Sequence, residues 1–201
     1  MVQPLLIVFA TLVTMEFAVA KFHQYIMHGI GWKWHESHHV SHEPIAYSSA
    51  DVKTNPPDNR LEKNDLYALV FSLATLLLFI FSAQYSAIWW IGVGISLYGF
   101  LYALMHDVIV HRRLRISWQP RKAYLKRLIK AHNLHHAVRA KDNSVSFGFL
   151  YAPPLHTLHA KLRVIKSQKA LAEITYCKSE NDRLQRNIPA SNVSTSKAPA
   201  R

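Results

Sequence analysis

The chain has few cysteines, few acidic residues and no glycine-rich phosphate loop. Its one cysteine, Cys177, excludes an intrachain disulfide and a thiolate-held metal cluster. The lack of a glycine-rich loop argues against nucleotide-binding folds. Only 12 Asp and Glu stand against 24 Lys and Arg, so the 201 residues carry a formal net charge of +12 at pH 7. A basic excess of this size indicates nucleic acid or a membrane surface as the partner.

The distribution of apolar residues favours the membrane over nucleic acid. Apolar residues make up 50% of the chain and lie in long blocks. Three blocks predict membrane-spanning helices: Pro4–Ala20, Leu66–Ala83 and Ala87–Met105. Each lies near the lower end of the roughly 17–25 residues that cross a bilayer. The sequence therefore predicts an all-α integral membrane protein with three clear spans, the second and third joined by a tight hairpin turn and all surrounded by membrane lipids.

The positions of lysine and arginine predict the orientation. The side that holds the ends of the first and third blocks is rich in Lys and Arg, whereas the N-terminal stub and the hairpin turn carry none. The positive-inside rule then places the loops and the C-terminus in the cytoplasm, with the protein in the inner membrane. The N-terminal block lacks a basic start and a small-residue cleavage site, so we expect a retained anchor and not a secretory signal.

The remaining segments are predicted to be non-spanning. Arg121–Val138 is a basic helix with one apolar stripe, which is typical of a membrane interface. Val145–Leu155 is apolar but interrupted by Gly and Pro, which predicts a capping or re-entrant segment or part of a fourth, interrupted span. We expect an irregular loop over Val40–Asp65. Residues 1–178 are predicted to form the membrane-embedded domain, and residues 179–201 a polar, disordered tail.

Histidine is the unusually abundant residue, with thirteen copies. Ten of them form two copies of one two-part pattern, HxxxxH followed by HxxHH, at or just beyond the ends of the first and third blocks. Histidines scattered at a membrane interface would not repeat a pattern, so we predict that these ten bind metal. They are His23, His28, His35, His38, His39, His106, His111, His132, His135 and His136. Three others, His42, His156 and His159, fit neither copy.

The spacing predicts two metal ions. Residues five apart on an α-helix differ by about 140° in direction and about 7.5 Å in height, so the two histidines of HxxxxH are expected to bind different metals. In HxxHH the first and third histidines share a helix face, whereas the adjacent pair diverges by about 100° and is expected to serve different metals. Imidazole ligands suit iron, zinc and copper alike, so the ligand type leaves the metal open.

Three acidic residues are candidates for a supporting role. Glu16 lies inside the first block, where an ionisable group indicates function. It is expected either to contact a neighbour of a ligand, to line a substrate channel, or to tie helices together. Asp107 and Asp142 are candidate acceptors for the second ring nitrogen of a metal-bound histidine. A metal pair at a membrane face suits a lipid-dissolved substrate, and a histidine-held iron pair activates O₂ for hydroxylation or desaturation of a lipid.

The histidine pattern resembles that of the fatty acid hydroxylase and sterol desaturase superfamily. The surrounding segments are similar to those of bacterial beta-carotene 3-hydroxylases over Thr14–Leu155, and they read HQYIMHG, WKWHESHH, NDLYALVF, HDVIVHRR, PRKAYLKRLIKAHNLHHAVR and VSFGFLYAPPL. The segment Val40–Lys63 is longer than expected for bacterial relatives but removes no ligand.

The resemblance implies a non-haem di-iron monooxygenase. It implies hydroxylation of C3 on the β-ionone rings of beta-carotene, giving cryptoxanthin and then zeaxanthin. It also implies two irons held by the ten histidines, O₂ as co-substrate, and electrons from NAD(P)H through ferredoxin. The basic residues near Arg112 and Arg121 are then expected to meet lipid headgroups or to dock an acidic electron donor.

Other classes remain open from the ligand pattern alone. A fatty acid or sterol hydroxylase or desaturase, or a carotenoid ketolase, shares it, and only the flanking segments favour the beta-carotene enzyme. A metal transporter is disfavoured because its ligands lie near the bilayer midplane, whereas these lie beyond the span ends. A bis-histidine haem protein needs only ligand pairs and leaves most of the ten histidines unexplained.

Overall fold

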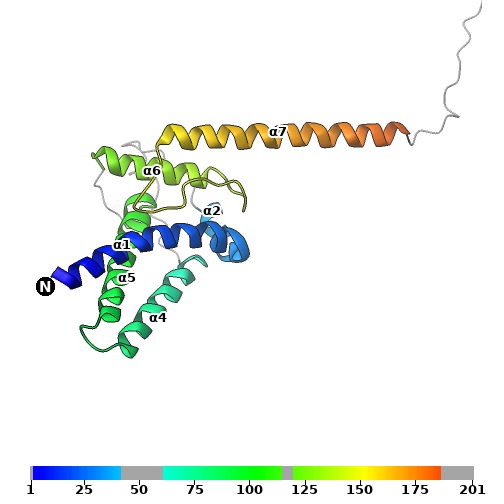
Figure 1. The fold of residues 1–201 in the computed structure, drawn as a ribbon. Coiled ribbons are helices and arrows are strands. Elements are labelled where there is room, and N and C mark those ends of the chain that lie inside the picture. Colours follow the sequence, from blue (N-terminus) through cyan, green and yellow to red (C-terminus); the bar gives the residue numbers. More distant parts are fainter. Residues whose placement is uncertain (1, 42–60, 115–119, 187–201) are drawn as a thin grey trace, which may run out of the picture. The chain divides into compact units, whose positions relative to one another are not determined.

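The computed structural model describes residues 2–41, 61–114 and 120–186, and this part of the chain is helical without strands (Figure 1). The order of elements is α1 (Val2–Phe22), η1 (His23–Ile30), α2 (Trp32–Ser41), α4 (Asp65–Phe81), α5 (Ala87–Ala103), η2 (Leu104–Val110), α6 (Ala123–His136) and α7 (Leu155–Arg186). The chain divides into two compact units, Met1–Leu162 and Arg163–Arg201. All ten patterned histidines belong to the first unit.

The apolar helices α1, α4 and α5 form the frame of the first unit. Helix α5 packs against both α1 and α4. Two glycines of α5 permit the close approach: a Cβ at Gly94 would lie 2.6 Å from the Cβ of Thr11, and a Cβ at Gly92 would lie 3.0 Å from the ring of Phe79. Small residues at such contacts allow the backbones of membrane helices to pack closely.

The long apolar helices expose their apolar side chains. Val2–Ile30 and Ala87–Val110 are long and apolar enough to cross a membrane, and only 11% and 22% of their most apolar windows are buried. The core helix of a water-soluble protein would be buried, so this exposure indicates a membrane protein. Helix α4 is also apolar but has 17 residues. It ends at Phe81, two residues before the predicted Ala83, because Ser82 adopts an extended conformation.

Other predicted segments differ in detail. The basic helix predicted over Arg121–Val138 is α6. Residues 145–154 are not helical, so within the described residues this segment does not form a fourth span. Helix α7 continues through Ser179 to Arg186, past the boundary expected at residue 178. Most of the predicted Val40–Asp65 loop, residues 42–60, and residues 187–201 of the predicted tail lie outside the described residues.

Glu16 ties α1 to α5 and to the segment that follows α6. Its buried carboxyl group accepts hydrogen bonds from the backbone N–H groups of residues 149–151, at 2.9–3.1 Å, and from the hydroxyl of Tyr98 at 2.8 Å. The segment folds tightly around this group, since a Cβ at Gly148 would lie 2.5 Å from Oε1 of Glu16. Of the roles expected for Glu16, the structure shows that it ties helices together. Its carboxyl group also accepts a hydrogen bond from the backbone N–H of Phe149.

We expect Glu16→Ala to lower the thermal unfolding temperature measured in detergent. The substitution leaves several buried donors without an acceptor, at a cost of about 3 kcal/mol, or roughly 6–12 °C for a chain of this length. Glu16→Gln keeps one carbonyl oxygen for the backbone donors and should lose much less. Equal unfolding temperatures for the wild type and the alanine variant would show that this tie does not stabilise the fold.

Candidate metal centre

The ten histidines are presented by two structural copies of one arrangement. In each copy an apolar helix ends in a π-helix that carries HxxxxH, and a separate α-helix carries HxxHH. The first copy is α1, η1 and α2, and the second is α5, η2 and α6. All ten side chains are buried, with exposed fractions of 7% or less. Burying so many polar rings together is costly unless their nitrogens find partners.

The π-helices change which histidines act together. Backbone bonds from residue i+5 to residue i close these turns, as from His111 N–H to the carbonyl of His106 at 2.9 Å. Such a turn brings residues five apart onto one face. His23 and His28 therefore lie in one group, and so do His106 and His111. The prediction that each HxxxxH pair serves two different metals is wrong, because it assumed α-helical geometry.

Nine of the histidines form two groups in which the nitrogens that could hold a metal lie within 4.8 Å of one another. The first group is His23, His28, His35, His39 and His135, and the second is His38, His106, His111 and His132. The tenth, His136, lies beside the second group, with ring centroids 4.6 Å from His132 and 4.9 Å from His111. The structure thus brings all ten predicted ligands into two adjacent clusters.

Each cluster takes one histidine from the other copy. His38, from the first copy, joins the second group, and His135, from the second copy, joins the first group. Both are the middle histidine of HxxHH. The expected divergence of adjacent histidines is seen, since His38 and His39 belong to different groups. This reciprocal exchange links the two copies through their ligands.

The Nδ1 atoms of seven of these rings face outward to oxygen acceptors at 2.7–3.2 Å. An acceptor oxygen cannot donate unless it is a protonated carboxyl, so Nδ1 carries the hydrogen, and a neutral ring is left with a bare lone pair on Nε2. The ring and acceptor pairs are His23 with Phe147 O, His28 with Lys141 O, His35 with Asn64 Oδ1, His38 with Glu62 Oε2, His39 with Val138 O, His106 with Asp107 Oδ1, and His135 with Val145 O.

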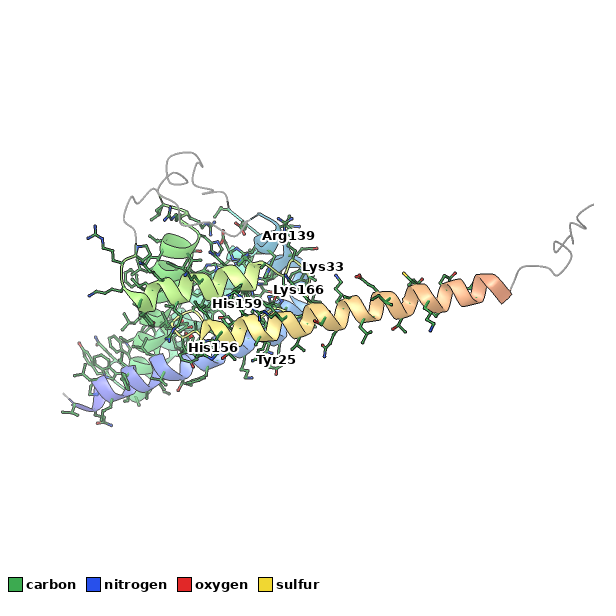
Figure 2. All side chains as sticks on the ribbon, turned by 90° about the horizontal axis from the view of Figure 1, so that it is seen from above. Tyr25, Lys33, Arg139, His156, His159 and Lys166 are labelled. Atoms are coloured by element: carbon green, nitrogen blue, oxygen red, sulfur yellow. The ribbon has the colours of Figure 1, made fainter. Side chains whose placement is uncertain are left out.

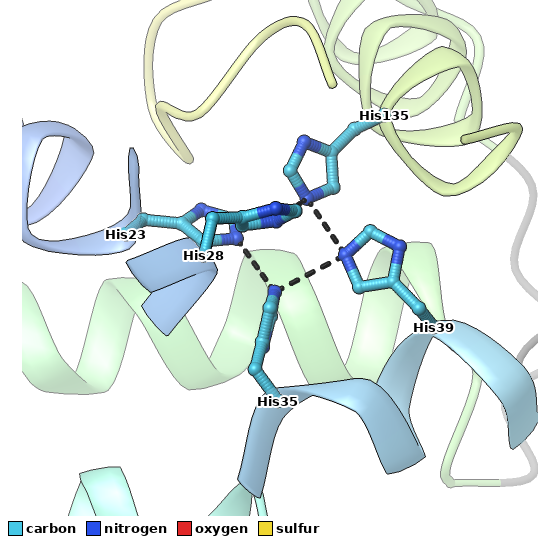
Figure 3. A group of neighbouring side chains, drawn as sticks. All are labelled: His23, His28, His35, His39 and His135. Carbon is cyan, nitrogen blue, oxygen red and sulfur yellow. Dashed lines mark hydrogen bonds between the residues drawn. The ribbon is translucent and has the colours of Figure 1, made fainter. Parts of the chain in front are cut away.

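The Nε2 atoms face one another inside each cluster. In the first group, Nε2 of His35 lies 2.9 Å from that of His23 and 3.2 Å from that of His39, and Nε2 of His135 lies 3.1 Å from that of His39 (Figure 3). In the second group the distances from His38 to His106 and from His111 to His132 are both 3.0 Å.

Facing lone pairs on neutral rings repel one another, whereas a cation between them is attracted to both. Two nitrogens held at right angles about 2.1 Å from one metal would lie about 3.0 Å apart, which agrees with these contacts. His136 provides a second observation that favours a bound cation, because both of its ring nitrogens are buried without a hydrogen-bond partner. The residues present therefore fit a metal ion in each cluster.

Five of the six histidines of α2 and α6 are held in the neutral form. Burial lowers the pKa of His35 to about 2 and that of His39 to about 4, although their Nδ1 bonds raise it. Burial, followed by repulsion from neighbouring histidines, lowers the pKa of His38, His135 and His136 well below 6.5. Neutral imidazole is the form that binds a metal ion.

An ion pair between Arg113 and Asp65 stabilises the region that holds Glu62 and Asp107, which accept from His38 and His106. Arg113 donates to both carboxyl oxygens of Asp65, at 2.7 and 2.8 Å, and lies 3.7 Å from Asp107. Asp65 in turn accepts from the backbone N–H of Glu62 at 2.9 Å. Arg113 therefore connects Asp107 of η2, which supports His106, to the short segment whose Glu62 supports His38.

Sequence reasoning missed Glu62 and Asn64 as supports. They lie between the two histidine copies, outside any repeated pattern, and only the tertiary fold brings them to His38 and His35. Of the candidate acceptors, Asp107 contacts His106, whereas the carbonyl of Lys141, not Asp142, accepts from His28. The two other described histidines, His156 and His159, are exposed on the first turns of α7 (Figure 2).

The chain is similar to characterised hydroxylases along most of its length. It is 49% identical over 159 residues to the beta-carotene hydroxylase of Pantoea ananas, covering 79% of this chain and 82% of the relative. It is 44% identical over 160 residues to the beta-carotene hydroxylase of Paracoccus sp. (strain PC1), covering 79% and 90%. A chloroplastic beta-carotene 3-hydroxylase of Haematococcus lacustris is 33% identical over 156 residues, covering 74% of this chain and 43% of that protein.

No family model and no solved structure matches the chain. The bacterial relatives, however, are matched at high identity over most of their own length and most of this chain. The chain belongs to the beta-carotene hydroxylase family.

Proposed function

We propose that this chain hydroxylates C3 of the β-ionone rings of beta-carotene, giving cryptoxanthin and then zeaxanthin, at a pair of iron ions held by the ten histidines. The observation that carries the proposal is the pair of buried clusters in which bare Nε2 atoms face one another. Its substrate comes from the bacterial relatives, which are named beta-carotene hydroxylases.

Iron is the metal that suits both the ligands and the reaction. Imidazole binds iron, zinc and copper, but zinc has no redox chemistry. Bound iron supplies the reductive activation of O₂ that breaks an unactivated C–H bond. One oxygen atom of O₂ enters the C3–H bond, and the other leaves as water with two electrons and two protons. We propose that NAD(P)H supplies the electrons through ferredoxin.

The protein's own residues prepare the site for this reaction. The Nδ1 acceptors fix each ring's tautomer and orientation, which is the usual role of groups behind metal-bound histidines. Burial lowers the pKa of His35, His38, His39, His135 and His136, which keeps these rings neutral, and it excludes bulk water. Because the ligands lie at the ends of α1 and α5, a lipid-dissolved substrate reaches them without leaving the bilayer.

We propose that α1, α4 and α5 all cross the inner membrane, with the metal centre on the cytoplasmic side. Helix α4, with its 17 residues, lies at the lower limit for a span, and Lys and Arg gather at the metal end of the helices. The exposed face of α6 carries Lys126 and Lys130, with Lys122 just before the helix at the same four-residue spacing, and its buried face carries three histidines of the clusters. An acidic ferredoxin docks most favourably on this basic stripe.

Pigment analysis tests the reaction. Bacteria that accumulate beta-carotene should form cryptoxanthin and zeaxanthin when they express this chain, and none when they express His135→Ala. The substitution removes the one histidine that the second copy contributes to the first group. His159→Ala is the matched control and should retain wild-type conversion, since His159 is exposed. Unchanged beta-carotene with iron-loaded wild-type protein in the membrane would refute the carotenoid assignment, and membrane fatty acids would be analysed next.

Metal analysis tests the two clusters. Protein reconstituted with ferrous iron without oxygen should hold about two irons per chain, measured by plasma emission after desalting. His38→Ala should weaken one cluster and His135→Ala the other, so each should lose roughly one iron and the double variant most of both. Full iron content in the double variant would show that the exchanged histidines are not ligands.

The lowered pKa values predict a loss of stability and activity in acid. Folded His35 and His39, with pKa values of about 2 and 4, stay neutral while the unfolded chain takes up protons below its histidine pKa of about 6.5. These groups should therefore not change the free energy of unfolding at pH 7–8. They should lower it as the pH drops from about 6.5 to 5. Hydroxylation and iron retention, measured across this range, should fall together. Unchanged activity at pH 5 would contradict neutral-histidine ligation.

A further inference from the structure

A cavity of about 540 Å³ lies between α1, α4 and α5, next to the metal centre. Along the chain its lining extends from Ile95 in α5 to Asp107 in η2. The twelve residue steps between them correspond to about 18 Å at the helical rise of 1.5 Å per residue. The cavity is therefore elongated, with one end beside the histidines and the other toward the hairpin turn between α4 and α5.

Two aromatic rings separate this cavity from the histidine clusters. Tyr102 stacks on His106, with centroids 4.9 Å apart and ring planes at 18°. Phe149 meets Tyr102 edge-on at 4.5 Å, stacks on His23 at 5.3 Å and lies 5.3 Å from His106. Phe149 thus touches a ligand of each cluster, and the inner end of the cavity is one aromatic layer away from both.

Three of the polar side chains in the wall have their hydrogen bonds elsewhere. Thr75 donates to the carbonyl of Phe71 in its own helix at 2.8 Å. Tyr98 donates to Glu16 at 2.8 Å, and Tyr67 donates to the carbonyl of Gly31 at 2.9 Å. The hydrocarbon parts of these residues line the cavity, which favours an apolar occupant that makes few hydrogen bonds.

The cavity opens sideways between α4 and α5. The two helices pack together near the hairpin turn, where Gly92 meets Phe79, and diverge toward the metal end (Figure 1). The exposed lining residues follow one stripe on each helix: Ala68, Ser72 and Leu76 on α4, and Ser96, Gly99 and Phe100 on α5. Several are small, and the surrounding exposed surface of these helices is apolar, so the opening faces the lipid.

We infer that this cavity receives one terminal ring and the adjoining polyene of a single carotenoid, which enters from the bilayer through the slot between α4 and α5. Phe149 and Tyr102 form the floor that limits how closely the ring approaches the metal centre. The inference rests on the proposed function, and it identifies the slot residues as determinants of substrate access. An elongated apolar slot that ends at an oxidising centre exposes the end of a long hydrocarbon, not its middle, to reaction.

Gly99 offers a direct test, because a Cβ at this position would meet nothing within 4 Å. The series Gly99→Ala, Gly99→Leu and Gly99→Trp fills the slot progressively without a clash at the backbone. Leu97→Trp is the matched control: Leu97 is 39% exposed on the same helix and does not line the cavity. Initial hydroxylation rates are measured with beta-carotene in phospholipid vesicles, and retained beta-carotene is measured by absorbance without oxygen.

We expect the alanine and Leu97→Trp variants to stay within about twofold of the wild type in kcat/KM, and Gly99→Trp to lose about tenfold or more, mainly through KM. Retained pigment should fall in the same order. Equal activity in Gly99→Trp and the wild type, or an equal loss in Leu97→Trp, would overturn the inference while leaving the proposed function intact. A wild type that forms no hydroxylated carotenoid would instead refute the proposed function. If Gly99→Trp binds less iron or unfolds earlier, Gly99→Leu decides by the same comparison.

Discussion

The burial of ten histidines side by side is the constraint on which the rest of this structure depends. Nine of the ten imidazoles have an Nε2 atom about 3 Å from that of another ring, an arrangement that is unfavourable for charged rings and for neutral rings without a cation. The surroundings therefore have to supply an acceptor for each Nδ1–H. Backbone carbonyls of the 138–147 segment, with Asn64, Glu62 and Asp107, meet most of that need.

This requirement explains the folding of segments that carry no ligand. The non-helical stretch after α6 supplies carbonyl oxygens from Val138, Val145 and Phe147, which a helix would use for its own hydrogen bonds. The same stretch continues to Gly148, where Glu16 holds it against α1. One loop thus orients histidines of the first cluster and closes the inner end of the apolar cavity with Phe149.

The exchange of the middle histidine of each HxxHH motif couples the two copies. Neither copy completes a cluster alone, because His38 crosses to the second group and His135 to the first. The close contact of α1 with α5 is consistent with this dependence, since these helices lead into the π-helical turns of the two HxxxxH motifs. The clusters are therefore properties of the assembled pair of copies, and loss of one shared ligand is felt in the other copy's site.

The sequence by itself determined the candidate ligands and the apolar helices, because a duplicated histidine pattern and long apolar blocks are local properties of the chain. It correctly separated His38 from His39, since adjacent residues on an α-helix point in different directions. It could not show that the HxxxxH segments are π-helical. It therefore wrongly assigned His23 and His28 to different metals, whereas the structure places them in one group. That choice depends on tertiary contacts that favour one extra residue per turn.

Only the tertiary structure decided which groups accept hydrogen bonds from the histidines, what Glu16 contacts and where the apolar cavity lies. Glu62 and Asn64 are ordinary polar residues of a loop until the fold brings them to His38 and His35. Glu16 stood out in the sequence as a charge within an apolar helix, but its partners lie more than 80 residues away, at Tyr98 and residues 149–151. The cavity between α1, α4 and α5 likewise depends on how three helices diverge, and no local pattern encodes that angle.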